Sequence, residues 1–183
     1  DSDEEIFKKV IENYGADSSF LFSDSTTISS EEIAKRVKRF MKNGIKFSGH
    51  HYEIASPFDW DGPDNPSRNH RYKIHAWIIL DEVLQYVERT NHKDYFYRCR
   101  DVAVEWIERY LFGGIEDDFT WYDMSTGQRS SLLSFFLRKS LFFASKSKYR
   151  SKKSKQNEIN VILKLIIAAD IHINELICEE RIA

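Results

Sequence analysis

Aromatic and charged side chains gather in the segment 58–71, where Trp60 lies between two aspartates and Asn69 and His70 follow. An indole face stacks on the C–H groups of a sugar ring, while charged planar groups bind hydroxyls and carboxylates, so this composition is typical of a carbohydrate site. Trp60, Asn69 and His70 are therefore candidate substrate-binding residues. The alternative is a tryptophan that only pins the loop onto neighbouring helices.

A second candidate segment runs from Trp121 to Arg129 and also contains Tyr122 and Asp123. An aspartate or serine here can cap the helix that follows, which places Arg129 about one turn inside it. If the segment faces a cavity, we expect the aromatic side chains and Asp123 to bind substrate and Arg129 to clamp an anionic group through two hydrogen bonds. The alternative is a local ion pair between Arg129 and a nearby aspartate. Those aspartates are Asp117, Asp118 and Asp123.

The stretch 129–155 carries nine basic residues and no acidic one. Its centre, residues 145–156, lacks apolar periodicity, which predicts an exposed basic loop over 146–155. Such a loop could bind an acidic polysaccharide, a nucleic acid or an anionic membrane surface, and a solvated loop is the alternative. The basic residues are Arg129, Arg138, Lys139, Lys146, Lys148, Arg150, Lys152, Lys153 and Lys155.

Several classes of protein are excluded by composition or by missing motifs. The 183 residues are 42% hydrophobic and contain few glycines and prolines, which excludes collagen-like and disordered chains. A net charge of −2 argues against a nucleic-acid partner. The sequence has no dinucleotide, P-loop, zincin or nucleophile-elbow motif and no run of about 18 apolar residues, so we expect no cofactor, no metal and no membrane span. Cys99 and Cys178 are expected to be buried thiols.

Hydrophobic periodicity predicts a mostly helical chain. A helix is expected within residues 1–15, and Ser29 with Glu32 has the capping-box spacing for a second helix that ends at Gly44. Residues 45–54 are expected to be extended, and three prolines then give an irregular connection. Further helices are expected at about 71–89, 94–112, after 129 and at about 157–179.

These helices predict an all-α fold of stacked antiparallel helical hairpins, preceded by a short irregular or extended N-terminal segment. Residues 1–67 would form the N-terminal helices and the proline-rich connection, and residues 68–183 the main helical part. Both a helical bundle and an α/α barrel agree with this pattern. Composition does not choose between them.

Three segments, 58–80, 94–111 and 120–137, together resemble the N-terminal helical domain of the heparinase II/III-like polysaccharide lyases. In that family a Trp-Asp-rich segment leads into a helix, a Tyr-to-Trp-Ile helix follows, and a Trp-x-x-Met-x-x-x-x-Arg segment opens the next helix. Here the last pattern is Trp121-x-x-Met124-x-x-x-x-Arg129, and Trp60 occupies the earlier tryptophan position. The resemblance covers residues 58–141.

The resemblance implies an incomplete α/α toroid and a bacterial enzyme that degrades uronic-acid-containing polysaccharides by β-elimination. It also favours a periplasmic or secreted location. The family's Asn-His pair normally follows a helix similar to residues 166–180, and no such pair follows here. The catalytic residues are therefore unknown and expected beyond Ala183, so this chain alone is expected to be inactive. The alternative is a non-catalytic helical module that binds acidic glycans.

Overall fold

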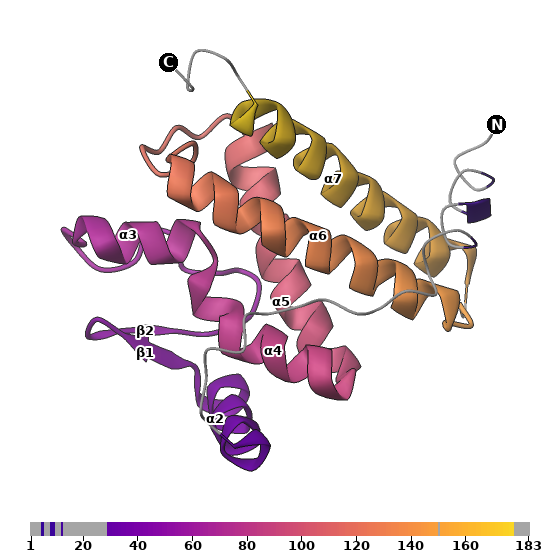
Figure 1. Cartoon of the computed structure of the whole chain (residues 1–183), viewed down its shortest axis with the longest axis horizontal. Coiled ribbons are helices and arrows are strands. Elements are labelled where there is room, and N and C mark those ends of the chain that lie inside the picture. Colours follow the sequence, from indigo (N-terminus) through magenta and orange to yellow (C-terminus); the bar gives the residue numbers. More distant parts are fainter. Residues whose placement is uncertain (1–4, 6–7, 10–11, 13–28, 150, 178–183) are drawn as a thin grey trace. The chain divides into compact units, whose positions relative to one another are not determined.

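The computed structural model describes residues 5, 8–9, 12, 29–149 and 151–177. The helix expected within residues 1–15 lies outside this part of the chain apart from four positions. The described elements, drawn in Figure 1, are α2 (Ser30–Asn43), β1 (Ile45–Phe47), β2 (His50–Tyr52), α3 (Arg68–His75), α4 (Asp81–Thr90), α5 (Lys93–Trp106), α6 (Asp123–Ser145) and α7 (Lys152–Leu176). Because helices dominate and the described strands form one two-stranded hairpin, the all-α prediction is confirmed. The incomplete toroid stays a prediction.

The chain divides into two compact units, and the division differs from the expected one. The first unit is Leu21–Gln128, and the second joins Arg129–Ala183 to Asp1–Phe20. A boundary after residue 67 was expected because the prolines there interrupt the helices. That position lies within the first unit, since the proline-rich loop is hydrogen-bonded to α5.

Local signals explain the start of the first unit. The Ser29 hydroxyl accepts a hydrogen bond from the Glu32 amide at 3.2 Å, and Gly44 ends α2 at a φ of 74°. The hairpin then pairs Ile45 with Tyr52 and Phe47 with His50. Both the capped helix and the extended segment are therefore confirmed.

The helix expected at 71–89 is broken at Trp77, whose φ of 60° lies in the left-handed region. This backbone conformation is sterically unfavourable for a bulky residue, so packing of the Trp77 side chain must stabilise it. Its indole is fully buried, with the Trp106 ring edge-on at a centroid distance of 5.6 Å. A 3₁₀ turn, Ile78–Leu80, then leads into α4, which pairs with α5. The chain continues beyond α5 as a π-helical turn, Ile107–Phe112, in agreement with the helix expected at 94–112.

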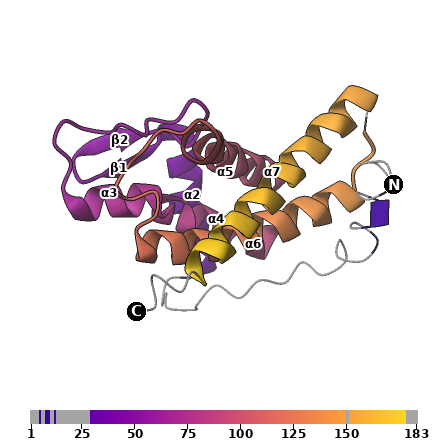
Figure 2. The same cartoon turned by 90° about the horizontal axis from the view of Figure 1, so that it is seen from above.

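The second unit contains most of α6 and all of α7, joined by a short connection that Figure 2 displays. Four buried side chains, Leu141, Ala144, Ile159 and Ile162, form a core between these two helices. The basic loop expected over 146–155 is shorter than predicted. Ser151 accepts a hydrogen bond from the Ser154 amide at 3.1 Å, and this cap starts α7 at Lys152, inside the expected loop.

One face of α7 carries apolar side chains that remain exposed. They are Leu163, Ile166, Ile167, Ile173 and Leu176, followed by Ile177. No helix in the described ranges is both long enough and apolar enough to cross a bilayer.

Candidate functional site

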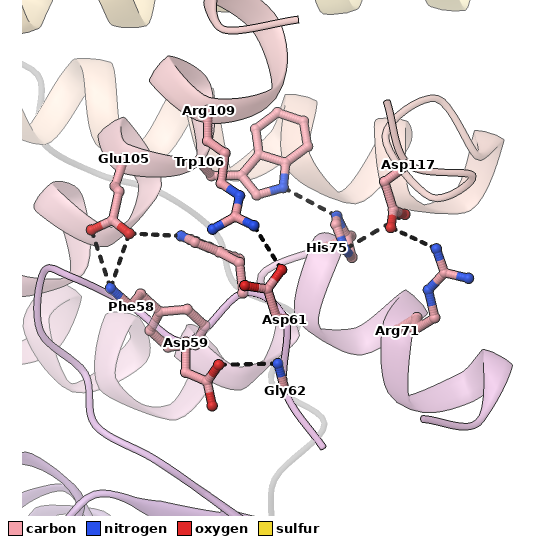
Figure 3. Close-up of polar contacts among 11 residues, drawn as sticks. Phe58, Asp59, Asp61, Gly62, Arg71, His75, Glu105, Trp106, Arg109 and Asp117 are labelled. Atoms are coloured by element: carbon pink, nitrogen blue, oxygen red, sulfur yellow. Dashed lines mark hydrogen bonds and ion pairs between the residues drawn. The ribbon is translucent and has the colours of Figure 1, made fainter. Parts of the chain in front are cut away.

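One carboxylate of α5, that of Glu105, accepts several hydrogen bonds from the proline-rich loop of the first unit. Its oxygens accept hydrogen bonds from the Ser56 hydroxyl at 2.6 Å, the Phe58 amide at 3.0 Å and the Trp60 indole N–H at 3.0 Å. Figure 3 displays the contact between Glu105 and the Phe58 amide. Trp60 is only 5% exposed. The indole therefore anchors the loop, which is the alternative to the sugar-stacking role that its composition suggested.

The anchored loop, α3 and the π-helical turn after α5 help to enclose a small polar pocket of about 130 Å³. We call it the inner pocket. Its walls are Tyr52, Trp60, Asp61, Pro66, His70, Arg71, Ile74, His75, Tyr110 and Asp117. Ligand sites usually measure about 300–1,000 Å³, so the inner pocket is too small to enclose a sugar residue.

Two buried side chains of the inner pocket, Tyr52 and His70, form a hydrogen-bonded pair with 2.5 Å between the Tyr52 hydroxyl and His70 Nε2. Burial, and to a smaller extent the Asp59 charge, raises the pKa of Tyr52 to about 12. Burial, and then nearby His50, lowers the pKa of His70. Neutral Tyr52 therefore donates to neutral His70 at neutral pH.

A second buried histidine, His75, links the inner pocket to the loop that precedes α6. The Trp106 indole N–H can only donate, and it lies 3.3 Å from His75 Nδ1, so this nitrogen carries the lone pair. His75 Nε2 faces the Asp117 carboxylate at 3.6 Å. Figure 3 displays the chain of contacts from Trp106 through His75 and Asp117 to Arg71.

Asp117 fixes this loop against α3. Its carboxylate accepts hydrogen bonds from Arg71 at 2.5 Å and from the Phe119 amide at 2.8 Å. Burial alone would raise the pKa of Asp117, but these hydrogen bonds and the charges of His75 and Arg71 together outweigh burial and leave the pKa below its ordinary value. The charged form of Asp117 therefore holds Arg71 and Phe119 in place.

A larger pocket of about 360 Å³ adjoins the inner pocket and shares Pro66 and Arg71 with it. We call it the outer pocket. Its walls are Pro66, Arg68, Arg71, Asp118, Phe119 and Tyr122. Its volume falls in the range that encloses small ligands.

Two arginines of α3 lie over aromatic rings of the outer pocket. The Arg68 guanidinium carbon is 5.2 Å from the centre of the Tyr122 ring, and that of Arg71 is 4.9 Å from the centre of the Phe119 ring. Stacking of this kind orders a guanidinium and leaves its N–H edge available. The N–H edge of Arg71 donates to Asp117, whereas exposed Arg68 forms no ion pair with a carboxylate within the described ranges. The outer pocket thus offers one ordered cation to a ligand.

The residues that the sequence predicted for the site do not all line the same pocket. Trp60 and His70 line the inner pocket and Tyr122 lines the outer one. Asn69 is exposed on α3, Trp121 is half-buried and Asp123 is the exposed first residue of α6, and these three line neither pocket. Arg68 and Arg71 of the outer pocket were not among the expected site residues. Their spacing of three residues after the Ser67 cap places both on one face of a helix, and this signal could have identified them.

Arg129 belongs to the second unit and is completely buried. Its Nε donates to His172 Nε2 at 2.9 Å, a partner that the sequence did not suggest, and His172 Nδ1 bonds the Ala168 carbonyl at 2.7 Å. Burial lowers the pKa of Arg129 to about 9, so the guanidinium remains charged at neutral pH. Because no part of Arg129 reaches the surface, it does not form the open clamp that was expected.

The basic stretch 129–155 is not a uniformly basic surface. Lys139 is 2% exposed and lies near the Phe142 ring, and Arg129 is buried as well. The lysines that are exposed lie at the end of α6, in the connection and in the first turn of α7. They are Lys146, Lys148, Lys152 and Lys153. Positive charge at a helix N-terminus is unfavourable, so these side chains do not stabilise α7.

Within the described ranges, no group of three or more His, Cys, Asp or Glu side chains is placed to hold a metal ion. Cys99 is a buried free thiol, as expected, and burial raises its pKa, while Cys178 lies outside the described residues. Comparisons with protein-family models, with curated proteins and with solved structures found no match. The outer pocket is therefore the candidate site on its geometry alone.

Proposed function

We propose that this chain is the N-terminal portion of a lyase that cleaves uronic-acid-containing polysaccharide by β-elimination, and that it contributes a wall of the substrate cleft. The observation that carries the proposal is the ordered Arg68 guanidinium over Tyr122 at the edge of a pocket of about 360 Å³. A guanidinium binds a carboxylate through two parallel hydrogen bonds, which suits the uronate group. The sequence resemblance over residues 58–141 supports the same function.

In β-elimination a base removes the C5 proton of a uronate, the C4–O bond breaks, a C4–C5 double bond forms, and an acid protonates the leaving oxygen. Tyr52 and His70 have the chemical types for these steps. However, both are buried, and the pocket of about 130 Å³ beside them is too small for a sugar residue. We therefore assign substrate binding to this chain and no proton transfer. A non-catalytic module for acidic glycans is the second candidate, because the outer pocket alone is sufficient for binding.

Replacement of Arg68 by alanine tests the proposed binding role. Loss of a charged hydrogen-bond donor is expected to weaken binding of an unsulfated uronate tetrasaccharide by about 10-fold to 100-fold. Isothermal titration calorimetry measures the change. The matched control is Arg39→Ala, since Arg39 is an exposed arginine over a phenylalanine ring of α2, outside both pockets. Equal affinities of the Arg68 variant and the unaltered protein would contradict the proposal.

The chain is expected to bind alginate, hyaluronan or heparan sulfate oligosaccharides without cleaving them. Ultraviolet absorbance of the unsaturated uronate product measures cleavage. Product formed by this chain would show that its own residues perform the elimination and would contradict the assignment of a binding role alone. An Asn-His pair and a β-rich domain in the same reading frame would favour the lyase over the binding module.

A further inference from the structure

The outer pocket carries one cation and one anion that are available to a ligand. Arg68 is exposed and faces no carboxylate within the described ranges. Asp118 lines the same pocket with a side chain that is 90% exposed, and its contact with Arg71 is long, at 3.7 Å. Arg71 itself is already neutralised by Asp117 at 2.5 Å.

The charges next to this pocket are also paired. Asp61, on the wall of the inner pocket, meets Arg109 at 2.6 Å. A second anionic group on a ligand would therefore find no further available cation in either pocket and would face the Asp118 carboxylate. Like charges at short distance oppose binding, and the effect is small for an exposed pair.

We infer that the outer pocket selects an unsulfated uronate residue, whose carboxylate binds Arg68 and whose hydroxyl donates to Asp118. This inference rests on the proposed binding of acidic glycans. Sulfation acts against binding in two ways, because it replaces a hydroxyl donor by an acceptor and adds a negative charge beside Asp118. A ligand with one carboxylate and free hydroxyls matches both exposed groups. The protein is thus directed to weakly charged uronans and away from heavily sulfated ones.

A sulfated glycan would also be attracted to the exposed lysines of the second unit by counterion release, without specificity. The test therefore uses the full chain with Lys152→Gln and Lys153→Gln, at about 150 mM salt, where long-range attraction is screened. The probes are a chondroitin tetrasaccharide without sulfate and the oversulfated tetrasaccharide of the same backbone. Calorimetry gives the ratio of the two affinities.

The unsulfated probe is expected to bind about 3-fold to 5-fold more tightly than the sulfated one. Asp118→Asn is expected to bring this ratio close to one, because the amide removes the repulsion. Asp64→Asn is the matched control, since Asp64 is an exposed aspartate of the proline-rich loop that lines neither pocket. Its ratio is expected to equal that of the Lys152→Gln, Lys153→Gln background protein.

Failure of the inference is distinguishable from failure of the proposed function. Binding of the unsulfated probe that depends on Arg68, with equal or tighter binding of the sulfated probe, overturns the selectivity and leaves the proposed function standing. An affinity ratio that Asp118→Asn does not change overturns the role of Asp118. Absence of binding by both probes, or binding that Arg68→Ala does not weaken, overturns the proposed function itself.

Discussion

Replacement of Glu105 by alanine is expected to lower the free energy of unfolding by about 3 kcal/mol. The carboxylate accepts hydrogen bonds from Ser56, the Phe58 amide and the Trp60 indole, and a hydrogen bond to a charged group contributes about 1.5–3 kcal/mol. Alanine leaves the Trp60 N–H without its Glu105 acceptor, and because the indole is only 5% exposed, water does not readily replace it. Urea unfolding monitored by tryptophan fluorescence measures the loss.

We call the hydrogen bonds that Glu105 accepts from the proline-rich loop the Glu105 clamp. A conservative replacement of Glu105 and a control replacement of another glutamate distinguish the loss of this clamp from the loss of an ordinary surface charge. Glu105→Gln keeps one acceptor oxygen and is expected to lose about half as much stability as alanine. Glu53→Gln is the control, because Glu53 is an exposed carboxylate close to the same loop. Glu105→Ala and Glu53→Gln variants of equal stability would contradict the clamp. Because Trp60 borders the inner pocket, Glu105→Ala is also expected to alter that pocket.

Acidification is expected to destabilise the second unit through His172. Burial, together with the Arg129 charge, lowers the pKa of His172 to about 4, whereas a histidine in an unfolded chain titrates near 6.5. Between these values the unfolded chain binds a proton that the folded chain does not, so stability falls as the pH decreases. The full loss, reached below the folded pKa, corresponds to about 3 kcal/mol. Above pH 6.5 His172 is neutral in both states and contributes no pH dependence.

The measurement is urea unfolding at a series of pH values from 7.5 to 4 for the unaltered protein and for His172→Gln. Glutamine can accept the hydrogen bond from Arg129 but does not titrate, so the slope between pH 6.5 and pH 4 is expected to decrease in the variant. His70 contributes to the slope in the same direction, because its pKa is also lowered. Identical slopes for the two proteins would show that His172 has the same pKa in the folded and unfolded states, and would contradict the prediction.

Local sequence signals predicted the elements whose ends are decided locally. The Ser29 cap and Gly44 fixed α2, and the short connection at Asn91 made α4 and α5 neighbours. The break at Trp77 has no proline or glycine to mark it. It depends on the burial of one indole against Trp106, a contact between helices that sequence periodicity does not contain.

The sequence predicted the segments that border the candidate site better than it predicted the roles of individual residues. The proline-rich loop and the segment at Tyr122 do border the pockets. The roles of these residues differ from the predicted ones because burial determines what each side chain can contact. Trp60 anchors the loop through Glu105, and Arg129 forms a buried hydrogen-bonded pair with His172. Arg68 was the better candidate, since its exposed position on α3 leaves its guanidinium available while Tyr122 orders it.

The Glu105 clamp has a consequence for how this chain can diverge. One of its contacts is a backbone amide, which any residue except proline supplies at position 58, so many loop sequences would keep the same course. The acceptor lies 47 positions further along, in α5. Saturation mutagenesis should therefore find the loop permissive between its anchor points and position 105 restrictive. Distant homologues should lose the composition of the loop before they lose the helical carboxylate.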